Sequence, residues 1–395
     1  MNHRIAPGRT AALALFAAAA ALLACLACAG FAEAKPKKDK GTVVNVMTRN
    51  LYLGADLGPA LSSTSQAAFF EANGGIVRQV EATNFPVRAK GLAAEILENE
   101  PDLVGLQEVA LWREAPPSVG PILSGKPSAE TVKYDFLALL LAQLNKKGNK
   151  YKAVVVQDEF DFEAPANANG VPGDGPGGGT GLLANSEVNG RLTMRDVILA
   201  RVGAGVVTSN PSSGNFVNPL VVKVAGGTEV SVTRGWTAID AKVRGSKKFH
   251  FVNSHLEAFD NEAEYPSFRA KQAGELVAPG GPADSKLPVV LLGDFNSDVK
   301  TEVKPGDGQA YRVLKQAGFR ERRKPLPNTC CLSTSYDLKT GGGKAEFDHT
   351  VDHVMTDTPK KIKLVTSKVT GLKKAKTGWW DSDHAGVFSS LLFLK

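Results

Sequence analysis

Residues 287–298 have the sequence Leu-Pro-Val-Val-Leu-Leu-Gly-Asp-Phe-Asn-Ser-Asp, an apolar run that ends abruptly in acidic and amide side chains. A short unbroken apolar run bounded by Pro and Gly is typical of a strand buried on both faces. Asp294 and Asn296 follow at a spacing of two, so an extended chain would point both to the same side. A carboxylate beside a carboxamide at the end of a buried strand is suited to holding a hard cation or a water molecule. The alternative is that Gly-Asp-x-Asn is ordinary turn chemistry.

The composition is that of a soluble globular protein. The chain has 395 residues, of which 43% are hydrophobic and 22% charged, which is enough for a sizeable core in one large domain or two. The formal net charge is +7 and the sequence pI is about 9.1. This basic balance suits a polyanionic substrate.

The N-terminus has the pattern of an export signal. Arg4 and Arg9 precede an Ala- and Leu-rich run over residues 11–29, and small residues follow at 32–34. This pattern predicts a cleaved signal peptide over residues 1–34, a basic segment over 35–41 and one domain over 42–395, hence a secreted or periplasmic protein. The alternatives are a retained membrane anchor or a lipoprotein modified at Cys25. The mature chain contains no predicted transmembrane segment.

Cleavage would leave only two cysteines, the adjacent pair Cys330 and Cys331. Adjacent cysteines can pair only through a strained ring, although an exported protein favours oxidation. Two plain thiols packed against the core are the alternative. The cysteines therefore indicate neither a disulfide scaffold nor a sulfur-rich metal motif.

Other apolar runs also end in polar side chains. A β-branched run over 42–47 leads to Asn50, and a run over 102–109 carries Glu108 at its end. The runs at 248–253 and 350–355 lead to or carry His255 and Asp352, and the segment 379–388 contains Asp383 and His384. Each has a structural alternative: Asn50 could close a turn, His255 could be a satisfied core histidine, and Glu108 could pair with an arginine such as Arg113.

The remaining pattern predicts alternating strands and helices. Helices are expected at 87–99, 131–144 and 311–317, strands at 152–156, 197–202, 217–224, 229–232 and 236–243, and a Pro- and Gly-rich loop at 164–190. Strands alternating with helices, with antiparallel runs between them, predict an α/β sandwich of two packed sheets with helices outside.

Taken together, the chain resembles the endonuclease/exonuclease/phosphatase superfamily, which has the DNase I-like fold. The matching stretches span nearly the whole mature chain: Arg49-Asn50, Leu106-Gln107-Glu108, Asn253-Ser254-His255-Leu256, Gly293-Asp294-Phe295-Asn296, Val351-Asp352 and Ser382-Asp383-His384. The resemblance implies a four-layer α/β/β/α sandwich, a divalent cation (Mg²⁺, with Mn²⁺ or Ca²⁺ as alternatives) and hydrolysis of a phosphate ester by water.

The resemblance also implies roles for the residues that match. Asn50, Glu108 and Asp383 would hold or position the metal. His384, oriented by Asp352, would act as general base or as a donor in the transition state. Asp294 and Asn296 would orient the attacking water and bind the phosphate, and His255 would donate to a phosphate oxygen or assist the leaving group.

The sequence departs from the family pattern in two respects. Some nucleases of the superfamily carry Asp two residues after the first Asn, where this chain has Tyr52. The basic signature of phosphoinositide phosphatases near the second His is missing. His250, His349 and His353 match no motif and are expected to be structural or surface residues.

The expected substrate is a phosphate ester, with nucleic acid favoured. The segment 360–376 contains seven Lys and no acidic residue, and residues 320–324 form a second basic cluster. These clusters could hold a phosphate backbone or merely solvate the surface, for instance along an edge strand. A lipid phosphodiesterase resembling bacterial sphingomyelinases is the alternative, since Trp379 and Trp380 could lie at a bilayer. A catalytically inactive binding module is a further alternative, and a monomer is expected.

Overall fold

The computed structural model describes residues 41–395 except 172, 176–182, 225–226, 228, 261–265, 301–307, 333–336 and 342–346. The predicted signal peptide and Cys25 lie outside the described residues. Among the helices that are described, none is both long and apolar enough to cross a membrane.

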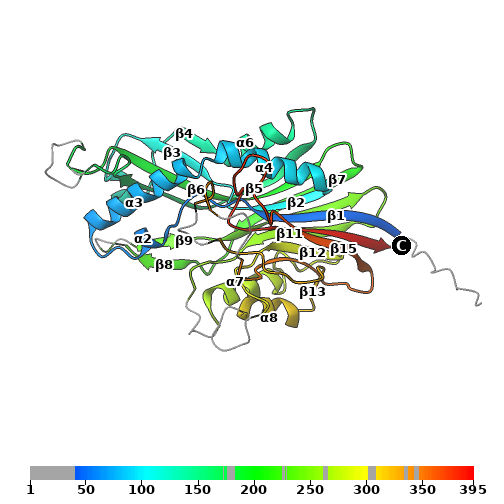
Figure 1. The fold of residues 1–395 in the computed structure, drawn as a ribbon. Helices are drawn as coiled ribbons and strands as arrows, with labels where there is room; N and C mark the ends of the chain where they lie inside the picture. Colours follow the sequence, from blue (N-terminus) through cyan, green and yellow to red (C-terminus); the bar gives the residue numbers. More distant parts are fainter. Residues whose placement is uncertain are drawn as a thin grey trace, which may run out of the picture. The chain divides into compact units, whose positions relative to one another are not determined.

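Two large mixed β-sheets form the centre of the unit Gly41–Lys395 (Figure 1). The first sheet contains, in spatial order, β15 (Ile362–Thr370), β16 (Gly386–Leu394), β1 (Gly41–Asn50), β2 (Leu103–Gln107), β6 (Val188–Arg201), β3 (Leu111–Ala115) and β4 (Thr131–Asp135), with β5 (Tyr151–Ala166) also paired to β6. The second contains β13 (Arg320–Glu321), β14 (Asp352–Thr356), β12 (Val289–Asp294), β11 (Phe249–His255), β10 (Gly235–Val243) and β7 (Val206–Asn215). A separate hairpin consists of β8 (Leu220–Lys223) and β9 (Glu229–Val232).

Helices lie on both outer sides of the sheet pair. Figure 1 shows α3, α4 and α6 along the first sheet and α7 and α8 along the second. The helices are α2 (Gly58–Leu61), α3 (Gln66–Ala82), α4 (Phe85–Asn99), α5 (Gly120–Ser124), α6 (Phe136–Leu144), α7 (Phe268–Val277) and α8 (Gln309–Gln316). The predicted four-layer sandwich is therefore confirmed.

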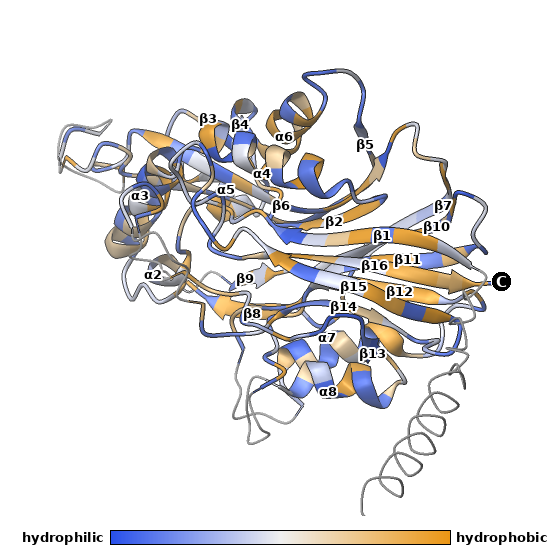
Figure 2. Ribbon diagram, turned by 45° about the vertical axis from the view of Figure 1, so that its right-hand side comes forward, coloured by the Kyte–Doolittle hydropathy of each residue, from blue (hydrophilic) through white to orange (hydrophobic). Residues whose placement is uncertain are grey.

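Side-chain alternation along the central strands produces three apolar layers between the four structural layers. In β12, Val290 and Leu292 pack between the two sheets, whereas Val289 and Leu291 pack outward against α7 and α8. Successive side chains of a strand point to opposite faces, so a strand covered on both sides must be apolar throughout. Figure 2 shows apolar residues concentrated on the central strands, among them β1, β11 and β12. The apolar run at 287–292 thus determines a central strand, as predicted.

Parallel pairing brings the polar strand ends to one edge. In the first sheet β1 runs parallel to β2, with Asn50 opposite Gln107. In the second sheet β11 runs parallel to β12, with His255 opposite Asp294, and the antiparallel β14 places Asp352 opposite Asp294. Because the carboxyl ends of parallel strands meet at one edge, segments more than 240 residues apart in the chain converge there.

Buried hydrogen bonds join the two sheets beneath this edge. Gln107 Nε2 on β2 donates to Asn253 Oδ1 on β11 at 2.5 Å, and Asn253 Nδ2 donates to the carbonyl of Leu106 at 3.2 Å. The approach is so close that a Cβ at Gly105 would lie 2.4 Å from Asn253 Oδ1. Only glycine fits at this position, and the sheets are held at a fixed offset here.

Several predicted boundaries are wrong. Residues 131–135 form a strand instead of the first turns of a helix, because Asp135 is the cap whose side chain accepts from the first amides of α6. The strand expected at 152–156 extends to Ala166, and β6 begins at Val188, so the predicted loop loses both ends to a long hairpin. The strand expected at 217–224 is shorter and covers only the four residues of β8. The elements β7 and α3 were not predicted, because their sequences lack a clear periodic pattern.

Replacing Asn253 by Ala should destabilise the domain by about 2–4 kcal/mol, because Gln107 Nε2 and the Leu106 carbonyl would lose buried partners. Urea unfolding followed by circular dichroism measures this difference. Val207→Ala, at a position 64% exposed on β7, is the matched control and should change stability by less than about 0.5 kcal/mol. Equal stability of the two variants would contradict the role given to Asn253.

Candidate active site

Asn50 connects the two sheets at the polar edge. Its Nδ2 donates to Glu108 Oε1 at 3.1 Å and to Asp294 Oδ2 at 2.9 Å, while its Oδ1 accepts from the amide of Tyr52. The second oxygen of Glu108 accepts from the amide of Leu53 at 2.7 Å. Asn50 therefore orients both carboxylates in this geometry. Glu108 itself has a φ of 53°, an unfavourable backbone conformation for a non-glycine residue at the end of a strand.

Arg113, the alternative partner considered for Glu108, does not pair with it in the structure. Arg113 lies on β3 and contacts Asp161 and Thr193 instead. Among the described residues, Glu108 thus lies at the site edge with an amide and a backbone N–H as its hydrogen-bond partners, and His255 Nε2 lies 4.0 Å from it.

His384 lies between two carboxylates. Its Nδ1 is 3.1 Å from Asp352 Oδ2, and its Nε2 is 3.6 Å from Asp294 Oδ2. Burial alone would lower the pKa of His384, but Asp352 and Asp294 raise that pKa well above its ordinary value. Burial also raises the pKa of Asp294, to about 6. The pair therefore combines an imidazolium with a carboxylate that can accept a proton near neutral pH.

His255 has the opposite electrostatic environment. Burial, followed by the charges of Arg234 and His384, holds the pKa of His255 well below its ordinary value. Both ring nitrogens of His255 face donors, since Arg234 Nη1 lies 3.2 Å from Nδ1 and Asn296 Nδ2 lies 3.0 Å from Nε2. Asp294 Oδ2 lies 3.6 Å from Nε2. This donor-rich environment disfavours the imidazolium, so His255 is a neutral imidazole.

The donor set at this edge suits a hard divalent cation. Burial raises the pKa of Asp383 to about 7, with Glu108 a further contributor, so this carboxylate lacks a compensating positive charge of sufficient strength. Asp294, Asp352 and His384 each offer one ligand atom, and these atoms lie within 4.8 Å of one another. Oδ1 of Asp352 has no hydrogen-bond partner among the described residues although it is buried. Oxygen-rich, negatively charged sites of this kind bind Mg²⁺ or Mn²⁺.

The structure thus brings together all eight residues singled out in the sequence. They lie at the ends of strands from both sheets or in the loops that directly precede or follow these strands: Asn50, Glu108, His255, Asp294, Asn296, Asp352, Asp383 and His384. Of the histidines outside the motifs, His353 is buried and contacts Glu321, while His250 contacts Asp240.

Sequence reasoning missed an adjacent charged cluster. Arg234 contacts both Glu257 and His255, and the buried carboxylates of Glu159 and Asp196 lie close to that histidine. Burial raises the pKa of Glu159 to about 8, although the charge of Arg234 lowers it, and neither carboxylate oxygen has a hydrogen-bond partner among the described residues. In the sequence, the only signal of this cluster was one acidic residue, Glu159 or Asp196, inside each of two runs that otherwise favour a strand.

The cysteine pair also lies next to the site. Cys330 and Cys331 are joined by a disulfide, and Cys331 Sγ lies 3.9 Å from His384 Nε2. The sequence left open whether this pair was oxidised and gave no indication that it adjoins His384.

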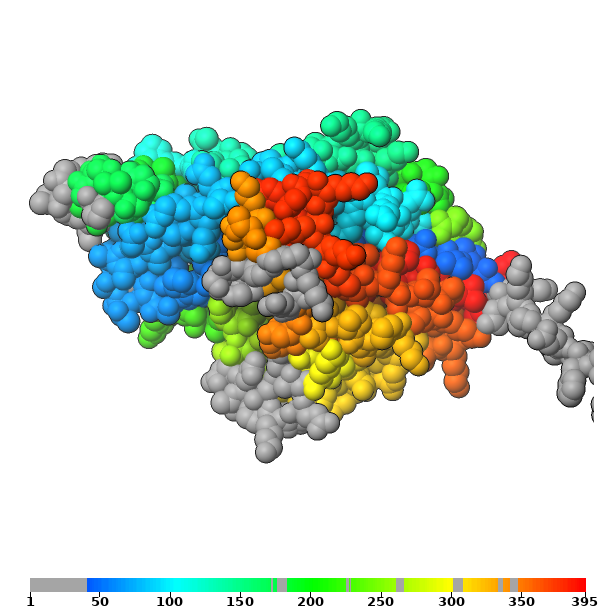
Figure 3. Space-filling model, viewed as in Figure 1, coloured from blue at the N-terminus to red at the C-terminus, as the bar shows by residue number. Residues whose placement is uncertain are grey.

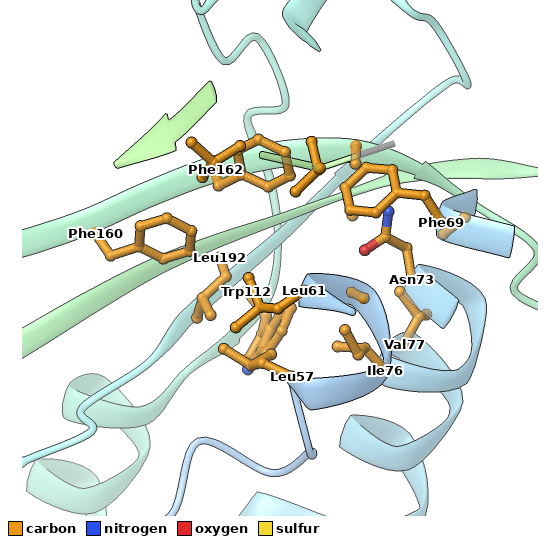
Figure 4. A pocket seen from close by; sticks show the side chains of 16 residues that line it. Leu57, Leu61, Phe69, Asn73, Ile76, Val77, Trp112, Phe160, Phe162 and Leu192 are labelled. Carbon is orange, nitrogen blue, oxygen red and sulfur yellow. The ribbon is translucent and has the colours of Figure 1, made fainter. Parts of the chain in front are cut away.

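An apolar pocket lies apart from the eight residues (Figure 4). Its walls come from α2, α3, β3, β5 and β6 and include Leu57, Phe69, Trp112, Phe160 and Leu192. Trp112, in the pocket wall, donates from Nε1 to the carbonyl of Leu53. The amide of Leu53 donates to Glu108, so Leu53 connects the pocket wall to the site edge.

Trp380, one of the two tryptophans considered for contact with a bilayer or a base, is completely buried. It packs against Leu332 and Leu338. Trp379 is partly buried beside Lys339. The pair therefore acts mainly in packing.

A profile of the Endonuclease/Exonuclease/phosphatase family matches residues 68–384. The chain belongs to this family. Members are phosphoester hydrolases that generally use divalent metals, which supports hydrolase activity here. No curated protein sequence matches the chain.

Solved structures of low sequence identity are similar to this chain. An endonuclease/exonuclease/phosphatase family protein from Leptotrichia buccalis is 15% identical over 89% of this chain and 100% of its own, with a TM-score of 0.50. A mannosyl-6-phosphatase from Bacteroides thetaiotaomicron is 16% identical over 89% and 100%, with a TM-score of 0.47. The human Nocturnin catalytic domain is 15% identical over 90% and 96%, with a TM-score of 0.44.

The two site histidines should titrate differently in metal-free protein. His384 should keep its proton to a higher pH than a free histidine, whereas His255 should stay neutral into the acid range. Asp352→Asn should lower the pKa of His384, because it removes the closest carboxylate. Imidazole C–H chemical shifts followed by NMR against pH measure both values.

The raised pKa of His384 also makes the stability of the fold depend on pH, and the direction of this dependence is defined. Because the folded-state pKa of His384 is raised, its contribution to stability is fully present below the unfolded value and is lost as pH rises through the folded value. His250→Gln, far from the site, is the control for the NMR assignment and should leave the His384 titration unchanged. An unaltered His384 pKa in Asp352→Asn would show that this carboxylate does not act on the ring.

Proposed function

We propose that the protein is an exported, divalent-metal-dependent phosphodiesterase that cleaves nucleic acid. The observation that carries this proposal is the convergence of Glu108, Asp294, Asp352 and His384 from four strand ends, with His384 held as an imidazolium between two carboxylates. A pure binding module would gain nothing from burying so many ionisable groups together.

Glu108 and Asp383 would hold the metal, with Asn50 fixing the orientation of the Glu108 carboxylate. The oxygen donors favour Mg²⁺, with Mn²⁺ or Ca²⁺ as alternatives. When bound, the cation supplies Lewis acidity toward a phosphoryl oxygen and neutralises charge in the transition state.

Asp294 is the proposed acceptor of the proton from the attacking water. Its pKa of about 6 leaves it ionised at neutral pH yet basic enough to take that proton. The Asn50 amide at 2.9 Å and the Asn296 backbone N–H at 2.9 Å fix the orientation of its two oxygens. Asn296 would also help to position the phosphate.

The two histidines would bind the phosphate as donors of different charge. His384, protonated and oriented by Asp352, donates from Nε2 to a phosphoryl oxygen and stabilises negative charge there. His255, kept neutral by burial and by Arg234, would donate to a second oxygen or assist the leaving group once substrate replaces the Asn296 contact at its Nε2.

The basic loop beside the site favours a nucleic-acid substrate. Lys373 and Lys376 are exposed on the segment that leads directly into Asp383 and His384. Lys363 and Lys368 lie instead on β15, an edge strand of its sheet, where charged side chains discourage pairing with other chains. Figure 3 shows this orange-red to red segment on the surface.

His384→Ala should reduce hydrolysis about 100-fold or more, because it removes the charged donor at the phosphate. Conversion of supercoiled plasmid to nicked circles measures the activity, and chelation of divalent metal should abolish it in the wild type. His349→Ala, at an exposed position outside the site, is the matched control and should retain activity. Chelator-resistant nicking would contradict the metal-dependent mechanism.

Glu108→Gln should weaken binding of Mg²⁺ or Mn²⁺ at least about tenfold, because it removes a negatively charged ligand. Isothermal titration calorimetry measures the affinity without a substrate. Glu114→Gln, on β3 and paired with Lys133, serves as the control. Equal metal affinity in both variants would remove Glu108 from the metal site.

Replacing Lys373 and Lys376 by Ala should lower the salt dependence of nucleic-acid binding by up to about two units of slope, one for each lost phosphate contact. Fluorescence anisotropy at several salt concentrations measures the slope. Lys361, directly before β15, and Lys368, on β15, are both exposed and form the control pair. If the control pair changes the slope and the loop pair does not, the substrate path lies elsewhere.

A panel of other phosphoesters tests the substrate class. Release of phosphocholine from sphingomyelin vesicles in the absence of plasmid nicking would assign the protein to lipid substrates, and cleavage of phosphomonoesters alone would make it a phosphatase. A failure to cleave any ester with Mg²⁺, Mn²⁺ or Ca²⁺ would support a binding module.

A further inference from the structure

The segment around Cys330 and Cys331 forms one wall of the proposed catalytic site. The Ala385 amide donates to the Thr329 carbonyl at 2.7 Å, and the Leu332 amide donates to the Asp383 carbonyl at 2.9 Å. Thr329 Oγ1 also accepts from the Asp352 amide at 3.2 Å. These bonds fix the cysteine pair beside both His384 and its carboxylate partner.

One residue of the pair is buried and the other is exposed. Cys330 is 1% exposed, whereas Cys331 is exposed and its Sγ lies 3.9 Å from His384 Nε2. This nitrogen is the one directed toward the phosphate in the proposed mechanism. Ligand atoms of both cysteines and His384 lie within 4.8 Å of one another.

The ligand set differs in chemistry from the neighbouring oxygen-rich site. Two thiolates and an imidazole favour soft or borderline cations such as Zn²⁺ or Co²⁺ over Mg²⁺. His384 is prepared for this role, because Asp352 bonded to Nδ1 orients the ring and increases the basicity of Nε2, as carboxylates do for metal-binding histidines. In the disulfide form, however, the sulfurs are not thiolates and cannot form this site.

We infer that Cys330, Cys331 and His384 form a redox-gated site for a thiophilic divalent cation, and that its occupation stops phosphoester hydrolysis. The disulfide keeps His384 available for the phosphate. Reduction creates a two-sulfur, one-nitrogen site that captures the imidazole. The inhibition, though not the metal binding, depends on the proposed function.

The chemistry balances with a phosphine as reductant. The phosphine attacks the sulfur–sulfur bond and water then hydrolyses the adduct, which gives two thiols and one phosphine oxide; the disulfide gains two electrons and phosphorus loses two. Binding of one Zn²⁺ or Co²⁺ then displaces the two thiol protons and, from an imidazolium, the proton on Nε2.

Co²⁺ absorption tests the site without reference to activity. The full chain is prepared with Cys25→Ser and Cys28→Ser, so that Cys330 and Cys331 are its only cysteines. It is titrated with Co²⁺ before and after treatment with a phosphine that binds metals weakly. The expected result is a thiolate-to-cobalt charge-transfer band that saturates at one equivalent, only after reduction.

Variants separate this site from the oxygen-rich one. Adding Cys330→Ser and Cys331→Ser should abolish the band, while Glu108→Gln should retain it. With one equivalent of Zn²⁺, plasmid nicking by the reduced protein should fall about 100-fold, and nicking by the serine variant should not change. Thermal unfolding establishes that the serine variant is folded.

Three results would overturn the inference. They are the lack of a charge-transfer band in the reduced protein, a band that persists in the serine variant, and a band that forms equally well without reduction. Because the band requires no substrate, its presence in a protein that cleaves no ester would refute the proposed function and leave the metal site standing.

Discussion

The site depends on the buried hydrogen bonds that Asn253 forms with Gln107 and with the Leu106 carbonyl, because they fix the offset of two otherwise separate sheets. Apolar packing between sheets is largely non-directional, so by itself it would permit small sliding movements. A buried amide pair cannot slide without leaving donors and acceptors unpaired, at a cost of about 1–3 kcal/mol each. The missing side chain at Gly105 allows the close approach that this pair needs. As a result, the strand ends of the two sheets meet at one level.

That offset explains why Asn50 can bond carboxylates from both sheets. Glu108 belongs to the first sheet and Asp294 to the second, and a single amide nitrogen reaches both. Two nearby carboxylates repel each other when buried, and a shared donor reduces but does not cancel this repulsion. Burial, with a smaller contribution from neighbouring carboxylates, raises the pKa values of Asp294 and Asp383, and the same buried negative charge accounts for the affinity expected toward a cation.

The same edge gives two histidines opposite properties. His384 contacts carboxylates on both ring nitrogens and becomes an imidazolium, while His255 faces a guanidinium and stays neutral. In the proposed mechanism, one residue type would thereby provide a charged and an uncharged contact for one phosphate. The His384 Nε2 atom that would bind the phosphate also lies 3.9 Å from Cys331 Sγ, so hydrolysis and the binding of a soft metal would compete for this single nitrogen.

The sequence by itself determined the layered α/β fold and the eight polar residues at the strand ends, because both follow from local pattern. An apolar run such as 287–292 can be satisfied only in the middle of a covered sheet, and a polar residue just after it must lie at an edge. It did not determine the helix-to-strand boundary near Asp135 or the long β5–β6 hairpin, where tertiary pairing outweighs local propensity. The tertiary structure alone decided which residues are neighbours: Arg234 at His255, the Glu159 and Asp196 carboxylates, and Cys331 at His384. These contacts join segments from 21 to 96 residues apart, and no local pattern encodes a distance through space.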